Sequence, residues 1–312
     1  MRQALVLIVV VALACAAAPD AARTPQIAAG VRLGAVDLGG LSAEPARTLI
    51  QTALAKPIQL VHGDTSVYAW PDKLGLRTPL DGALGAALAA PANGRLTLPA
   101  HWSSARLRGL VAQVASDFAV APVPAQLVSV VKGRPVIRDA KPGAAVDRTA
   151  LTRALTGALR TGNREPVAIP MHSVRASKTR ANFGPVVWID RTTNTLRLFN
   201  STKLVRVIRV ATGQPAYPTP AGLWHVVDKQ ENPWWRPPNS PWAAGAKPIP
   251  PGPGNPLGTR WMGLDAAGVG MHGTPDAASI GYSASHGCIR MHIPDAEWLF
   301  NRVEIGTPVY IT

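Results

Sequence analysis

The run from Ser285 to Met291, Ser-His-Gly-Cys-Ile-Arg-Met, places a thiol and an imidazole two residues apart, and a second histidine, His272, lies shortly before it. The sequence contains two cysteines, and the other, Cys15, lies in an apolar N-terminal stretch. Cys288 is therefore the single thiol of the remaining chain. A thiolate is a strong nucleophile, and a nearby imidazole is a common means of removing the thiol proton. These residues predict a cysteine nucleophile with a histidine as general base.

The two histidines suit different geometries. His286 and Cys288 would point to the same side of an extended strand, which fits either a direct pair or a supporting role for His286. His272 would reach the sulfur from a neighbouring strand, so the residue types leave the choice of base open. Gly287 gives the backbone freedom to turn consecutive N–H groups toward the sulfur, where an acyl oxyanion needs hydrogen-bond donors.

Two other interpretations of this cluster are open at this stage. A cysteine between small residues is often a buried hydrophobic side chain without reactivity. His272, His286, Cys288 and His292 could also form a zinc site, although their spacing does not match the usual ligand pairs. The sequence predicts no metal and no cofactor.

The motifs resemble the signature of the L,D-transpeptidase catalytic domain, the YkuD or ErfK/YbiS family. This resemblance implies that Cys288 is the nucleophile, that His272 is the general base, and that the Gly273 carbonyl orients the His272 ring. Arg290 stands where other branches of the family have Asn, which matches the ErfK/YbiS branch. The resemblance covers residues 186–312, and its further matches are Val187 to Asp190, Ala211 to Gly213, Pro218 to Gly222, Asn255 to Gly258 and Ser279 to Gly281. The residues expected to support the site or the oxyanion are Gly273, Ser285, His286, Gly287 and Arg290.

The resemblance also implies the reaction. Cys288 would be acylated by a peptidoglycan tetrapeptide stem with release of D-alanine, and the acyl group would pass to an amine, forming a cell-wall cross-link or attaching a protein. Members of the family are acylated by carbapenems. Two alternatives stay open: an L,D-carboxypeptidase or endopeptidase that hydrolyses the same thioester, and a wall-binding protein with an inactive catalytic domain.

Residues 24–178 contain no catalytic constellation. Two segments there share a pattern in which a helical run precedes a strand-like run, and Ser42 and Thr149 are the expected helix caps. The segments are Ala43 to Ala55 with Pro57 to Val61, and Leu151 to Arg160 with Pro166 to Pro170. We expect an α+β region with a weak internal duplication. Trp70-Pro71, Pro142-Gly143 and the run from Gly30 to Ser42 resemble the peptidoglycan-binding domain that precedes L,D-transpeptidase domains in some bacteria.

The expected fold class is a multidomain α+β protein, in which this α+β region precedes a β-rich, sandwich-like catalytic domain. The polar run 179–185 is typical of a linker. After it, residues 186–190, 195–199 and 205–211 are predicted strands of a meander, residues 223–227 continue it, and a short helix begins near Pro294.

The segment 232–259 is rich in proline and glycine and carries Trp234, Trp235 and Trp242. Its length and composition predict either a packed surface loop or a cover over the site. Its tryptophans either contact glycan rings or the peptide stem, or pack the loop onto the sheet.

Residues 1–22 have the parts of a secretory signal: Arg2, an apolar run from Ala4 to Ala14, and small residues after it. The sequence before Cys15 also resembles a lipoprotein cleavage box, and an uncleaved N-terminal anchor is a third possibility. We expect an exported protein of the cell envelope, in the periplasm or the cell wall, that meets a membrane through this segment alone.

The formal net charge of +14 suits a polyanionic cell wall or membrane surface. Lysines and arginines are scattered without the basic-aromatic stripe of a nucleic-acid-binding protein, so we expect no nucleic-acid partner. A basic bias of the whole proteome explains the charge equally well. The expected partners are peptidoglycan stem peptides, as donor and acceptor, and anionic wall polymers.

Overall fold

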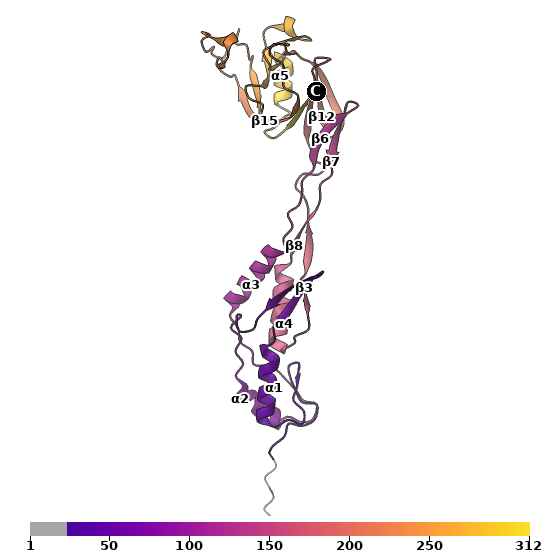
Figure 1. Cartoon of the computed structure of the whole chain (residues 1–312), viewed down its shortest axis with the longest axis vertical. Coiled ribbons are helices and arrows are strands. Elements are labelled where there is room, and N and C mark those ends of the chain that lie inside the picture. The colour runs from indigo at the N-terminus through magenta and orange to yellow at the C-terminus, as the bar shows by residue number, and fades with distance from the viewer. Residues whose placement is uncertain (1–23) are drawn as a thin grey trace, which may run out of the picture. The chain divides into compact units, whose positions relative to one another are not determined.

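The computed structural model describes residues 24–312, so the expected signal or lipoprotein segment at 1–22 lies outside the described residues. Across the described chain, no helix is long and apolar enough to cross a membrane. The chain divides into two compact units (Figure 1). Of the described residues, the upstream unit contains 24–119 together with 145–172, and the C-terminal unit contains 120–144 together with 173–312.

The upstream unit combines four helices with two small sheets. The helices are α1 (Ala43–Ala55), α2 (Leu80–Ala89), α3 (Ser104–Asp117) and α4 (Arg148–Thr161). The sheets have the orders β2 (Val36–Asp37), β1 (Arg32–Leu33), β5 (Arg95–Leu96) and β4 (Thr65–Ala69), β3 (Ile58–His62), β9 (Val167–Ala168). Strands β8 (Gly143–Val146) and β10 (Met171–Val174) pair with each other where the chain passes between the units.

The two helix–strand segments expected from the sequence are both present. Helix α1 leads into β3 and α4 leads toward β9, and the two strands pair in parallel. Helix α4 begins after Asp147, whose carboxylate accepts the Ala150 N–H (2.9 Å). The prediction that Thr149 caps this helix is therefore wrong: Thr149 already lies in the helix, while Asp147 has the extended backbone that a cap requires.

The C-terminal unit is built on one eight-stranded sheet, which confirms the expected β-rich class. Helix α5 (Ile293–Phe300) packs on β16 and β17, and the expected Pro294 is its second residue. The sheet order is β13 (Lys203–Arg209), β12 (Thr195–Asn200), β11 (Pro185–Asp190), β20 (Pro308–Ile311), β15 (Gly222–Glu231), β16 (Arg260–Leu264), β17 (Gly270–Thr274), β19 (Ile289–His292). The smaller elements are the hairpin β6 (Gln126–Val131) and β7 (Arg134–Arg138), the pair β14 (Thr212–Gly213) and β18 (Ser283–Ser285), and short 3₁₀ turns at Pro241–Ala243 and Ala277–Ser279.

The sheet buries apolar side chains on both faces of β11. Val187 points into the main core, and its neighbour Val186 points the other way, because successive side chains of a strand alternate. Leu127 and Ile137 of the β6–β7 hairpin cover Val186 and Phe199 on that second face. The hairpin lies within the region 24–178 that the sequence assigns upstream, yet it packs as part of the C-terminal unit.

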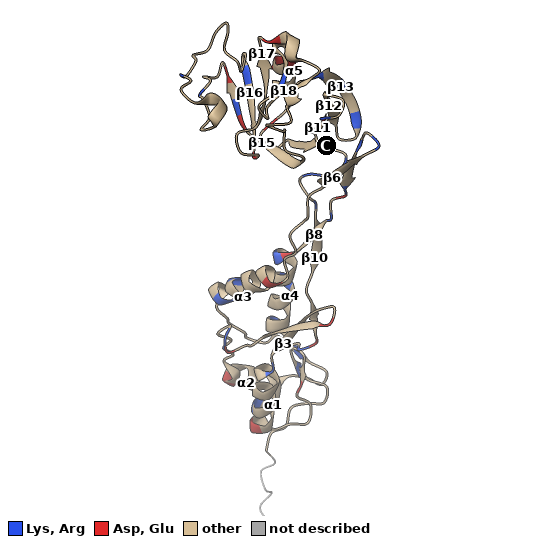
Figure 2. Cartoon of the chain, turned by 45° about the horizontal axis from the view of Figure 1, so that its top comes forward, with Lys and Arg blue, Asp and Glu red and all other residues tan. Residues whose placement is uncertain are grey.

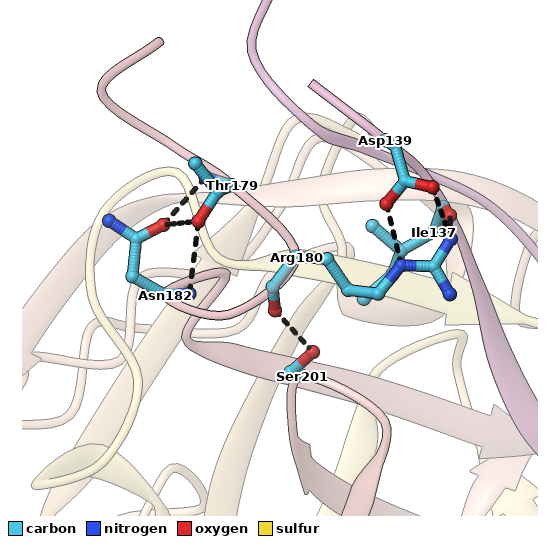
Figure 3. A network of polar contacts seen from close by, with 6 residues as sticks. All are labelled: Ile137, Asp139, Thr179, Arg180, Asn182 and Ser201. Atoms are coloured by element: carbon cyan, nitrogen blue, oxygen red, sulfur yellow. Dashed lines mark hydrogen bonds and ion pairs between the residues drawn. The ribbon is translucent and has the colours of Figure 1, made fainter. Parts of the chain in front are cut away.

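The run 179–185, typical of a linker in the sequence, makes defined polar contacts inside the C-terminal unit (Figure 3). The Arg180 guanidinium donates to both carboxylate oxygens of Asp139 (2.7 and 3.0 Å) and to the Ile137 carbonyl (2.7 Å). Ser201, in the turn between β12 and β13, donates to the Arg180 carbonyl (2.8 Å). Arg180 thus ties the hairpin to the start of the sheet, with the bidentate geometry that makes such pairs specific.

Lysine and arginine occur in both units, among other places on α3, β13 and β16 (Figure 2). In the described residues the basic side chains are therefore distributed over both units, and the examples named lie on a helix of the upstream unit and on two strands of the eight-stranded sheet. The eight-stranded sheet is the element that positions the reactive residues.

Candidate active site

The reactive residues lie on β17 and on the bend that leads into β19, its parallel partner. Strand β17 pairs with β19 so that Met271 stands opposite Ile289 and His272 opposite Arg290. Met271 and Ile289 are completely buried in the main core. Because side chains alternate along a strand, His272 and Arg290 face away from that core. Cys288 lies in the bend 286–288 just before β19, not on the extended strand expected from the sequence, and it lines one cavity with His272 and Arg290.

Cys288 is a free, half-buried thiol. Its sulfur lies 3.6 Å from the Gly268 carbonyl. Burial raises the pKa of the thiol, while the Gly270 amide and the positive charge of Arg290 act in the opposite direction. Since burial prevails, the resting group is the neutral thiol, and a base is required to make the nucleophile.

His272 is 3% exposed, and its Nδ1 lies 2.6 Å from the Gly273 carbonyl oxygen. A carbonyl oxygen only accepts hydrogen bonds, so Nδ1 carries the proton and Nε2 keeps a free lone pair. Burial lowers the pKa of His272 to about 4, with the Arg290 charge acting in the same direction and the Gly273 carbonyl against it. The ring is neutral at physiological pH and its tautomer is that of a general base.

Trp261 of β16 supports the His272 ring. The two residues stand opposite each other across β16 and β17, and their rings stack at 5.9 Å with an angle of 28° between the planes. The indole lies over Gly263 and Gly270, a cross-strand pair in which a methyl group on either residue would collide with the indole. The two glycines therefore provide the room that lets Trp261 lie flat beside the imidazole.

A tight turn leads into Cys288. Gly287 has a φ of +110°, which favours glycine. Ser285 is fully buried, and its hydroxyl donates to the Cys288 carbonyl (2.6 Å) while accepting the Gly287 N–H (3.1 Å). Thr219 donates to the Gly287 carbonyl (2.8 Å). The Gly287 amide is thus engaged within the turn, and Ser285 acts on the backbone that carries the sulfur.

His286 lies in a different environment from His272. Its ring stacks on Trp242 (4.1 Å, 15°) and is tilted against Tyr217 (5.0 Å, 53°). Burial and the nearby Arg290 charge lower the pKa of His286. Its Nδ1 is buried and has no hydrogen-bond partner within residues 24–312. Aromatic packing, with no fixed hydrogen bond at Nδ1, sets the orientation of this ring.

Arg290 supplies positive charge beside both histidines and the thiol. Its guanidinium lies 3.8 Å from the carboxylate of Asp276. The charge disfavours protonation of His272 and His286 and favours the thiolate of Cys288. Arg290 therefore biases the thiol–imidazole pair toward neutral imidazole and anionic sulfur.

These side chains open on a cavity of about 880 Å³, of which one wall is the loop 232–259. We call this segment the loop wall and the face of β16, β17 and β19 with its reactive residues the strand floor. The sequence left two alternatives for this loop, a packed surface loop or a cover over the site. The loop has packing contacts of its own, and it also borders the cavity. Trp234, Trp235 and Trp242 line the cavity together with His272, His286, Cys288 and Arg290.

The loop wall is held by its own hydrogen bonds. Trp235 and Ile249 exchange two backbone bonds (3.0 and 2.9 Å). Asn255 is 1% exposed, and its amide group donates to the carbonyls of Pro233 (2.9 Å) and Pro250 (3.0 Å). The Asn255 oxygen accepts the Leu257 N–H (2.9 Å). One buried side chain therefore connects both ends of the loop.

All seven site residues predicted from the sequence lie on or beside β17, β18 and β19. His292, considered as a zinc ligand, is the exposed last residue of β19. Across residues 24–312, no group of three or more His, Cys, Asp or Glu side chains is arranged to hold a metal ion. Sequence reasoning missed Trp261 and Tyr217 as site residues. The available signal was Gly263 and Gly270, against which the Trp261 indole lies, since glycine inside a strand often marks a close approach.

Comparisons with known proteins match a family model to a segment of the upstream part of the chain and another to its C-terminal part. A model described as "L,D-transpeptidase catalytic domain" matches residues 184–311, and one described as "Putative peptidoglycan binding domain" matches residues 81–168. These two domains indicate a protein of the cell envelope that acts on peptidoglycan.

Two Bacillus proteins are among the relatives. "Putative L,D-transpeptidase YqjB" of Bacillus subtilis is 39% identical over 133 residues, which is 41% of this chain and 71% of that protein. "Putative L,D-transpeptidase YkuD" of Bacillus licheniformis is 36% identical over 118 residues, 38% of this chain and 59% of that protein. The crystal structure of L,D-transpeptidase 3 from Mycobacterium tuberculosis is 21% identical, with a TM-score of 0.36 over 62% of this chain and 97% of that one.

Proposed function

The chain belongs to the L,D-transpeptidase family and is an enzyme of this type, and from this premise we propose that it transfers acyl groups through a thioester on Cys288. The donor is a peptidoglycan tetrapeptide stem, and the leaving group is its terminal D-alanine. The acceptor is an amine of a second stem or of an attached protein. No metal or cofactor takes part, because the sulfur and the imidazole supply nucleophile and base.

The first half-reaction forms the thioester. His272 Nε2 takes the thiol proton as the Cys288 sulfur attacks the carbonyl of the third stem residue. The tetrahedral intermediate then collapses, and His272 returns the proton to the leaving amine of D-alanine. Because the pKa of the thiol is raised and that of His272 is lowered, proton transfer accompanies the attack and no resting ion pair is needed.

The second half-reaction resolves the thioester. The acceptor amine attacks the acyl carbon and loses a proton to His272, and the sulfur leaves and regains a proton. Water competes with the amine for the same intermediate, so an L,D-carboxypeptidase would differ from a transpeptidase only in this step. The arrangement of thiol and base serves both outcomes.

One observation carries the proposal. The His272 tautomer is set by the Gly273 carbonyl, so the Nε2 lone pair is available in the cavity that His272 shares with the Cys288 thiol. A histidine that only filled the core would not need a free thiol, an arginine and an 880 Å³ cavity beside it.

The test is incubation of the purified chain with tetrapeptide muropeptides. We expect an intact-mass increase equal to the acyl stem on the wild-type chain and none on Cys288→Ser. Cross-linked dimers among the products would identify a transpeptidase, and shortened tripeptides a hydrolase. Undiminished turnover by Cys288→Ser would refute the proposed nucleophile.

A carbapenem provides a second probe of the same sulfur. Its strained carbonyl resembles the D-alanyl end of the donor, so we expect a covalent adduct on Cys288, seen as an intact-mass increase. The absence of an adduct under conditions where muropeptides react would count against this similarity.

We propose that the upstream unit contributes binding to the wall, and that residues 1–22 direct export or anchor the chain. Binding by the upstream unit would raise the local concentration of the insoluble substrate without changing the thioester chemistry. Anionic wall polymers would add a salt-dependent component to this binding through the net charge of +14. Co-sedimentation with intact sacculi across a salt series measures both contributions.

A further inference from the structure

The loop wall presents aromatic surface to the cavity. Trp234 is 51% exposed and Trp242 is 37% exposed, and both line the cavity that contains Cys288. One face of Trp242 is already covered by the His286 ring. Large exposed indole faces inside a cavity are unfavourable in water, and they are typical of a binding surface.

The stem peptide does not match this aromatic surface. Its reacting end carries carboxylates, an amine and methyl groups; the carboxylates would find Arg236 and Arg290, and the amine Glu231, on the same cavity. A pyranose ring matches the indoles better. Its C–H groups carry a partial positive charge that suits the negative face of an indole.

The reach is also suitable. Three extended residues separate the attacked carbonyl from the sugar that carries the stem, a span of roughly 10 Å. The cavity is continuous from Cys288 to Trp234. We infer that the loop wall is a glycan subsite: Trp234 and the free face of Trp242 stack on the sugar that carries the donor stem.

This inference rests on the proposed function and names the form of its donor, a stem still attached to glycan. Because the Asn255 side chain and the Trp235–Ile249 bonds fix the wall in advance, little conformational entropy is lost when a sugar binds.

The test compares two donors, a disaccharide-tetrapeptide and the same tetrapeptide without sugar. Initial rates of Cys288 acylation are measured by intact mass at low donor concentration. We expect the wild-type chain to prefer the disaccharide donor by about tenfold, as one aromatic–sugar contact would give. In Trp234→Ala the ratio of the two rates should fall toward one.

Tyr282→Ala is the matched control, because Tyr282 is an exposed aromatic residue of the C-terminal unit (67% exposed) that does not line the cavity. It should retain the preference. Equal use of both donors by the wild-type chain would overturn the inference. So would an equal slowing of both donors in Trp234→Ala, since the wall would then recognise the peptide, or loss of the preference in Tyr282→Ala alone.

A binding measurement separates this inference from the proposed chemistry. Calorimetric titration of Cys288→Ser with both donors should show tighter binding of the disaccharide form, and the difference should disappear when Trp234→Ala is added. Absence of any thioester on the wild-type chain would refute the proposed function, while the titration would still decide whether the wall binds glycan.

Discussion

The strand floor and the loop wall face the same cavity but are held in different ways. The floor residues His272 and Cys288 adjoin Met271 and Ile289, which are fully buried on the other side of the sheet. The wall residues lie on a proline-rich segment held by the Asn255 side chain and by backbone bonds, among them the Trp235–Ile249 pair and the bond from the Asn232 N–H to the Thr259 carbonyl (2.8 Å). This difference supports the proposed division of roles, in which the residues proposed to move protons are fixed by the core and those proposed to bind the rest of the substrate are carried by a loop.

The two histidines provide the sharpest test of this division. His272→Ala should lower the acylation rate by about 10²- to 10⁴-fold, because the floor loses its base. His286→Ala should cost about tenfold, since it changes only packing near the thiol. Acylation rates with a tetrapeptide muropeptide measure both. A larger loss in His286→Ala would reverse the assignment and identify His286 as the base.

The second test uses acid stability. The folded-state pKa of His272 is about 4 and that of an unfolded histidine is about 6.5, so below pH 6.5 the unfolded chain binds the extra proton. Above pH 6.5 the titration of His272 therefore does not lower the free energy of unfolding. Below pH 6.5 its burial lowers that free energy progressively as the pH falls toward 4, by roughly 3 kcal/mol in total.

His272→Asn is the matched variant, because its amide group can still donate to the Gly273 carbonyl but does not titrate. Urea unfolding of the C-terminal unit between pH 7 and pH 4 should show a smaller loss of stability in His272→Asn than in the wild-type chain. Parallel curves would mean that the floor does not bury a neutral histidine.

Trp261 tests how tightly the floor positions its base. Trp261→Ala should slow acylation by about 10- to 100-fold by freeing the His272 ring, and Trp261→Phe should restore most of the rate. In the pH profile of the acylation rate, the midpoint of the acid limb should also move from near pH 4 toward pH 6.5, because water then reaches the His272 imidazole. Trp298→Ala removes another half-buried indole of the same unit and should leave that limb in place. An unshifted limb in Trp261→Ala would exclude the positioning role.

The smallest expected effect is that of Asn255→Ala, which changes the loop wall and leaves the strand floor intact. Asn255→Ala removes the donor from the buried carbonyl of Pro233 and the partly buried carbonyl of Pro250, so amide exchange should increase within residues 232–259. The acylation rate should fall only a few-fold, because the floor is unchanged. The exposed Asn301→Ala serves as control. A loss as large as that of His272→Ala would show that floor and wall are not separable.

The sequence indicates candidate residues on the floor more readily than on the wall, for a physical reason. Thiol and imidazole in one short run define a chemical hypothesis locally, although the strands β17 and β19 are not among the predicted strands. The packing of Trp261 depends on what β17 places beside it, His272 opposite and Gly270 against the indole, and the anchoring by Asn255 depends on which carbonyls a folded loop brings to it. Neither is contained in a local pattern.

The same limit applies to the hairpin β6–β7. Its two strands are not among the predicted strands, and nothing local indicates that Leu127 and Ile137 would cover Val186 and Phe199 of two distant strands. The polar composition of 179–185 is likewise typical of a linker, and only the fold shows Asp139 placed to bind Arg180.

The placement of this hairpin has a consequence for how the chain is made. Residues 120–144 leave the ribosome before the strands they cover, and the sheet is completed only when β20, at residues 308–311, pairs in parallel with β11. Leu127 and Ile137 are therefore uncovered until β11 and β12 follow, and their cluster is complete only when Tyr310 of β20 packs against it. We expect a chain ending before residue 308 to be cleaved readily by protease in 120–144, whereas the full chain should resist, as a time course of limited proteolysis would show.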